Sequence, residues 1–91
     1  MSVKGVRMSL DAIYQKLTDI LREVFDEDTL VARPTLTADQ VDGWDSFAHL
    51  RLMFTVEKAF GVSFAASEIS SLQNVGDLAK MIAAKTGAAV A

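Results

Sequence analysis

Apolar residues recur every three or four positions over three stretches of the chain, and this spacing predicts three amphipathic helices. The stretches cover residues 10–25, 46–60 and 75–86. Polar residues fill the other positions, and we expect those of the first stretch, Thr18 and Arg22 among them, to face water. The side chains expected in the core are Leu10, Ile13, Leu17, Ile20, Leu21 and Val24, then Leu50, Met53, Phe54, Val56 and Phe60, then Val75, Leu78, Met81 and Ile82.

Residues with the chemistry of helix caps stand at the ends of these stretches. Ser9, Asp45 and Asn74 each precede one of them, and their side-chain oxygens can accept from the free amides of a first helical turn. Gly61 and Gly87 follow the second and third stretches, where glycine is favoured because it adopts the left-handed conformation without strain. The predicted ends are therefore supported by local chemistry as well as by periodicity.

The two connections between these stretches differ in length and in structure. From residue 26 to 45 the periodicity fails, and Pro34 with an Asp-Gly pair at 42–43 breaks any helix. A connection this long is either functional or disordered. The later link contains a brief helical turn over 66–72, with Ile69 and Leu72 turned inward. The apolar residues available to pin the first loop are Leu30, Val31, Leu36 and Val41.

These elements predict an all-α fold, a small up-down bundle of three longer helices plus one short helix. Ninety-one residues leave room for one core, which we expect to span residues 9–86 between flexible tails over 1–8 and 87–91. Apolar residues make up 51% of the chain, which is a globular composition. The chain has no cysteine, so a disulfide framework and a thiolate metal site are excluded.

The charge is concentrated in the first loop. The chain carries a net charge of −3, while residues 26–45 hold six acidic residues against one arginine. Nucleic acid is therefore a poor candidate partner, because no basic face is available to hold phosphates. The acidic run at 26–28 lacks the alternating ligands of a calcium loop, so we expect no metal. Without a long apolar run or a signal-peptide core, we expect a cytoplasmic protein with no membrane insertion.

The candidate chemistry lies where the acidic loop meets the second helix. Asp45 is the expected N-cap, which places Ser46 at the mouth of the helix with its hydroxyl near the surface. Free amides and the helix dipole both favour negative charge at such a position. Ser46 is therefore well placed to hold a phosphate group.

The same segment resembles the attachment site of acyl carrier proteins. Asp45-Ser46-Phe47, followed by a helix that ends Glu-Lys-Ala-Phe-Gly-Val over 57–62, is similar to the family's Asp-Ser-Leu serine and second helix, and the likeness runs from Ser9 to Lys85. The resemblance implies a 4′-phosphopantetheine arm on Ser46, flanked by Asp45. It implies acyl groups held on that arm as thioesters. It also implies a carrier and not an enzyme, a monomer whose partners are a phosphopantetheinyl transferase and acyl-activating, acyltransferase or synthase enzymes.

The sequence departs from the family pattern on the second helix. Arg51 and Lys58 stand where acidic residues are common, whereas Glu57 is retained. We expect partners to dock with Phe47, Leu50, Arg51, Asp42 and Glu57 around the serine. The Gly-Trp-Asp-Ser version over 43–46 is similar to stand-alone carriers that serve dedicated lipid, polysaccharide or secondary-metabolite pathways.

Three alternatives remain open at this point. Peptidyl carriers are the nearest, although they more often have glycine at the position of Trp44. A non-carrier helical interaction module would use the same apolar faces. A small hydrolase could pair Ser46 with His49, which lies three residues later, but it would also need an orienting acid and a cleft. We expect His49 to be solvated or partner-facing, and Trp44 to anchor the loop with its indole N–H on a polar group.

Overall fold

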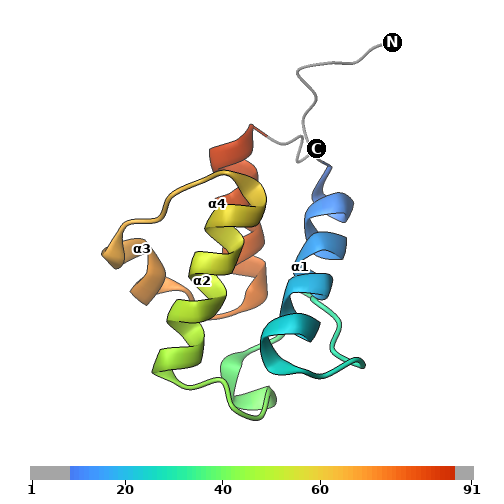
Figure 1. The fold of residues 1–91 in the computed structure, drawn as a ribbon. Helices are drawn as coiled ribbons and strands as arrows, with labels where there is room; N and C mark the ends of the chain where they lie inside the picture. The colour runs from blue at the N-terminus through green and yellow to red at the C-terminus, as the bar shows by residue number, and fades with distance from the viewer. Residues whose placement is uncertain (1–8, 88–91) are drawn as a thin grey trace.

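The computed structural model describes residues 9–87, and these residues form a helical bundle (Figure 1). Helices α1 (Leu10–Phe25), α2 (Ser46–Phe60) and α4 (Val75–Thr86) are the long elements, α3 (Ala66–Ser71) is short, and a 3-10 turn, η1 (Ala38–Gln40), interrupts the first loop. Helix α1 runs antiparallel to α2 and α4 and packs against both. The predicted fold class is confirmed, while residues 1–8 and 88–91 of the expected tails lie outside the described part.

The caps form as the local sequence predicts. The Ser9 hydroxyl accepts from the amide of Ala12 at 3.1 Å, and the Asn74 side-chain oxygen accepts from the amide of Asp77 at 2.8 Å. Gly61 and Gly87 adopt the left-handed conformation just beyond α2 and α4. Because each of these interactions joins residues close in sequence, the helix ends could be read from the sequence.

The core lies where α1, α2 and α4 meet. Two residues expected there are on the surface instead, since Leu50 is 44% exposed and Phe54 is 61% exposed. Helix α2 is apolar on two sides, and packing turns the side that carries Leu52, Met53 and Val56 inward. The largest fully buried side chains are Ile13, Leu17, Leu21, Leu36, Leu52, Met53, Val56, Val75 and Ile82. Four more of the expected core residues, Leu10, Val24, Phe60 and Met81, are only half-buried.

The long first loop is held onto α1 by hydrogen bonds as well as by apolar contacts. The amide of Ala32 donates to the Thr18 hydroxyl at 2.9 Å, and the Arg22 Nε donates to the carbonyl of Leu30 at 2.8 Å. Thr18 and Arg22 are therefore half-buried anchors, which corrects their expected exposure to water. Leu36 and Val41 are buried as expected, whereas Val31 is exposed and Ala32 takes its place.

The same loop also joins the start of α4. The amides of Val75 and Gly76 donate to the carbonyls of Leu36 and Pro34 at 2.9 and 3.1 Å. A Cβ atom at position 76 would lie 2.9 Å from the Pro34 carbonyl oxygen, so only glycine allows this approach. The loop is thus an ordered part of the bundle, and it delivers the chain to the start of α2. Within residues 9–87 no helix is long and apolar enough to cross a membrane.

Candidate functional site at the start of α2

Ser46 is the first residue of α2, and its side chain is exposed. The Asp45 carboxylate accepts from the amide of Ala48 at 2.8 Å, so Asp45 is the N-cap that the sequence predicts. Gly43, with φ of 85°, occupies the left-handed region, and its carbonyl accepts from the amide of Asp45 at 3.0 Å. This tight turn ends the loop and leaves the Ser46 hydroxyl beside the free amides of the first helical turn.

A groove opens directly beside Ser46, between the start of α2 and α3. Its lining includes Leu50 from α2, Ile69 and Ser70 from α3, and Leu72 just beyond α3. Behind the groove lies a small cavity of about 40 Å³, which reaches the first turn of α4. The residues that line both spaces are Ala38, Trp44, His49 and Leu72.

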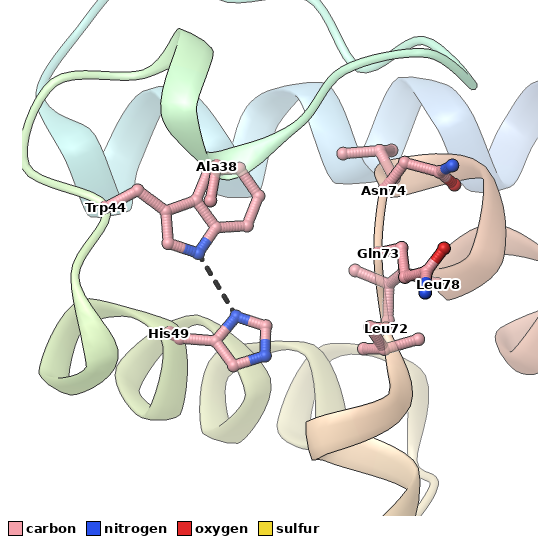
Figure 2. A pocket seen from close by; sticks show the side chains of 8 residues that line it. Ala38, Trp44, His49, Leu72, Gln73, Asn74 and Leu78 are labelled. Atoms are coloured by element: carbon pink, nitrogen blue, oxygen red, sulfur yellow. Dashed lines mark hydrogen bonds between the residues drawn. The ribbon is translucent and has the colours of Figure 1, made fainter.

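Trp44 anchors the end of the loop onto the bundle. Its ring packs against Phe25 at the end of α1, with ring centroids 5.1 Å apart. Its indole Nε1 donates to the Nδ1 of His49 at 3.1 Å (Figure 2). Both parts of the expectation for Trp44 are therefore confirmed, the apolar anchoring and the polar partner for the N–H.

His49 is half-buried and hydrogen-bonded through both ring nitrogens, which corrects the expectation of a solvated or partner-facing side chain. Since Nδ1 accepts from Trp44, the proton lies on Nε2, which faces the carbonyl oxygen of Ile69 at 3.2 Å. The neutral ring thus has no nitrogen left to take a proton from Ser46. The serine–histidine pair of the hydrolase alternative lacks the hydrogen bond that a nucleophile needs from its base.

The outward face of α2 beyond Ser46 combines apolar and basic side chains. Phe47 is 79% exposed, and Phe54 follows two turns later on the same side. Arg51 and Lys58 are exposed between and after them. The spacing of Phe47, Leu50 and Phe54 by three and four residues is the signal that could have assigned Phe54 to this surface.

The two expected acidic contacts have different surroundings. Asp42 is exposed in the loop before Ser46. Glu57 is half-buried, and its carboxylate accepts from the amide of Phe64 at 2.8 Å, which holds the link between α2 and α3. Glu57 therefore has a structural role that the sequence did not reveal, because its partner is seven residues away in an irregular segment.

The pKa values of Glu68 and Tyr14 are shifted, and both groups lie away from Ser46. The pKa of Glu68 in α3 is lowered, first because its carboxylate accepts from the amide of Ala65 and second because Lys85 lies beside it. Burial raises the pKa of Tyr14 in α1 above 10.0. Within residues 9–87 no group of three His, Cys, Asp or Glu side chains could hold a metal ion.

Comparison with known proteins identifies the class. The family described as "Phosphopantetheine attachment site" matches residues 15–82, which is well over half of the chain. The chain belongs to this family of carrier domains. It is similar to the holo acyl carrier protein of Geobacter metallireducens, a solution NMR structure, with 39% sequence identity and a TM-score of 0.76 over 87% of this chain and 86% of that one. No curated protein matches the chain.

Family and fold together establish the general function of the protein. The protein is an acyl carrier protein that bears a covalent phosphopantetheine arm, and such carrier domains are not enzymes. As a carrier it acts through partner enzymes. The start of α2 fits the arm, because an exposed hydroxyl, free amides and an adjoining groove lie together there. When bound, the arm supplies a thiol, which this cysteine-free chain otherwise lacks.

Proposed function

We propose that Ser46 is the residue that carries the 4′-phosphopantetheine arm. The observation that carries this proposal is the position of its exposed hydroxyl, at the first residue of α2 and on the rim of the groove. Helix amides and dipole would favour the phosphate there. Asp45 would serve the site indirectly, since its cap to Ala48 sets the start of the helix.

Attachment is a phosphoryl transfer carried out by a phosphopantetheinyl transferase. The Ser46 hydroxyl gives up its proton and forms an O–P bond with the phosphorus next to the pantetheine of coenzyme A. The P–O bond to the adenosine side breaks, and adenosine 3′,5′-bisphosphate leaves. The base and the magnesium ion for this step belong to the transferase.

The test is the intact mass of the protein after incubation with coenzyme A and a broad-specificity transferase. Wild-type protein should gain one phosphopantetheine, and Ser46→Ala should gain none while keeping its helical circular dichroism. Ser70→Ala is the matched control, since Ser70 is another exposed serine that lines the groove. It should be modified like wild type. Modification that survives in Ser46→Ala would remove the proposal.

On the loaded protein the arm's thiol would hold acyl groups as thioesters. Tethering raises the effective concentration of the acyl group at a docked enzyme to about the millimolar scale. We assign the protein to a dedicated lipid, polysaccharide or secondary-metabolite pathway, on the basis of Trp44 before the Asp-Ser pair and of the basic residue Arg51. The partners proposed are acyl-activating, acyltransferase or synthase enzymes. The carrier domain over 9–86, the monomeric state and the cytoplasmic location stay predictions.

The proposed docking surface surrounds Ser46 and continues along α2. Phe47 and Leu50 would supply apolar contact, Arg51 a positive charge, and Asp42 a negative charge before the helix. Their exposure supports the assignment. Glu57 was expected to contribute as well, and its bond to the amide of Phe64 means that a partner would have to share a carboxylate already in use.

A further inference from the structure

One side chain joins three segments of the chain at the groove beside Ser46. His49 belongs to α2, its Nδ1 accepts from Trp44 at the end of the first loop, and its Nε2 faces the carbonyl of Ile69 in α3. Each of these contacts is within hydrogen-bonding distance, at 3.1 and 3.2 Å. Helix α3 is short and contributes only the partly buried Ile69 to the core, so the contact with His49 helps to hold it beside α2.

The pair of rings stands at the boundary between two spaces. Trp44 and His49 line both the open groove next to Ser46 and the small cavity behind it. Figure 2 shows the two rings facing each other, with Leu72 and Leu78 across the cavity. At about 40 Å³ the cavity has room for only a few water-sized groups, since each needs about 10–15 Å³ of such volume. An acyl chain can therefore enter only if Trp44 or α3 moves.

The bonding pattern requires a single form of the histidine. Nδ1 can accept from the Trp44 N–H only when it carries no proton, and Nε2 can donate to the Ile69 carbonyl only when it does. The tilted contact between the Trp44 and Phe25 rings holds the indole in place from the other side. The neutral Nε2–H tautomer is thus matched to both neighbours at once.

We propose that His49 is a positioning residue that acts as a latch, defined as its paired hydrogen bonds to Trp44 and to the Ile69 carbonyl. The latch closes the inner cavity, so an acyl chain on the arm lies in the outer groove. This inference rests on the proposed role of Ser46 only where it concerns the acyl chain. The closed state itself is a property of the unmodified protein.

The first experiment uses the unmodified protein. Nitrogen-15 NMR of His49 should show the neutral Nε2–H tautomer, and exchange of the Trp44 indole hydrogen reports on opening, because Trp44 is the only tryptophan. His49→Leu removes both hydrogen bonds and should speed this exchange roughly 3- to 10-fold, as expected for loss of a net hydrogen-bond contribution. A protonated ring, the opposite tautomer, or unchanged exchange in His49→Leu would overturn the latch.

Two matched variants separate the latch from general packing. Asparagine places an oxygen near the position of Nδ1, so His49→Asn should retain the slow exchange at Trp44 while losing the bond to Ile69. Glutamine reaches the position of Nε2, so His49→Gln should retain the bond to Ile69 while Trp44 exchanges faster. If all three variants change exchange equally, bulk at this position matters and the two hydrogen bonds do not.

The second experiment uses holo protein carrying butyryl or octanoyl thioesters. In wild type the octanoyl chain should leave the methyl signals of Leu78, which lines the inner cavity and not the groove, where they are in the holo protein. In His49→Leu it should shift those signals, and thioester cleavage by hydroxylamine should slow by a similar 3- to 10-fold, since the chain is then sheltered. An octanoyl chain that shifts the Leu78 signals equally in both proteins would overturn the exclusion. If Ser46 accepts no arm, the proposed function fails while the first experiment still decides the latch.

Discussion

Arg51 is an exposed residue whose charge can affect which partners bind, although it contributes little to the fold. It lies on the outward face of α2 with Lys58, beside the exposed ring of Phe54. In acyl carrier proteins with an acidic second helix, basic partners bind this face. A positive charge here opposes such partners, because like charges brought together at an interface cost several kcal/mol, roughly enough to exclude a partner.

We therefore predict that Arg51→Glu changes partner choice and leaves stability nearly unaltered. The free energy of unfolding should change by less than about 1 kcal/mol, as for an exposed charge. Acyl transfer by fatty-acid synthase enzymes should improve, and transfer by the protein's own partner should weaken. The rates are measured at low and raised salt, because screening should reduce both effects.

The matched control is Arg33→Glu, a charge reversal at an exposed residue of the first loop, away from the outward face of α2. It changes the net charge by the same amount and should leave both rates close to wild type. Equal rates for Arg51→Glu and wild type at low salt would show that Arg51 is not a specificity element.

At the scale of elements, the first loop and α4 position the site together. The loop is fastened at Thr18 and Arg22 on α1 and at Gly76 on α4, and its far end delivers Trp44 and Asp45 to α2. Because the loop is held on both α1 and α4, the segment that leads into the start of α2 has little freedom to move. The path of the loop therefore depends on the close contact between Pro34 and Gly76, although neither residue lines the groove beside Ser46.

Gly76→Ala tests this dependence. Alanine is favoured over glycine in a helix by about 1 kcal/mol, yet the new Cβ would meet the Pro34 carbonyl oxygen at 2.9 Å. Because that oxygen belongs to the backbone, the loop must shift, and overpacking of this kind costs about 1–3 kcal/mol. We predict a net loss in the free energy of unfolding, measured by chemical denaturation. Lys80→Ala, at an exposed position of the same helix, should stay within about 0.5 kcal/mol of wild type.

For the whole molecule, α3 is the least firmly attached helix. The Glu68 carboxylate reaches Lys85 of α4 at 3.1 Å, Glu57 holds the preceding link, and His49 faces the Ile69 carbonyl. These polar contacts add to a small apolar contact, since Ile69 and Leu72 pack against the core but remain partly exposed. Helix α3 should therefore respond to pH more than the long helices do.

The lowered pKa of Glu68 sets the direction of that response. The folded protein favours the carboxylate, first through the Ala65 amide and then through Lys85, so this stabilisation is present above the unfolded value of 4.5. It is lost as the pH falls through the lower folded pKa. We predict that the free energy of unfolding falls less in Glu68→Gln than in wild type between neutral pH and a pH below 4.5. The measurement is chemical denaturation of both proteins at the two pH values. Lys85→Met should fall between these two proteins, because the Ala65 amide remains, and equal acid sensitivity in all three would contradict the assignment.

The sequence by itself determined the features that depend on near neighbours. Helix ends follow from caps such as Asp45 on Ala48, three residues apart, and from glycines such as Gly61, so the bounds and the all-α class could be predicted. The place of Ser46 at the start of α2 follows from the same local chemistry. The family resemblance was visible for the same reason, because its motif is continuous in the chain.

Tertiary structure decided which of several local possibilities was realised. Helix α2 has two apolar sides, and only packing against α1 turned Met53 inward and left Phe54 on the surface. His49 gained its second partner from Ile69, twenty residues away, and Thr18 gained Ala32 from fourteen away. Such contacts form only when distant segments meet, and the energy of burying apolar area across the whole bundle selects that arrangement.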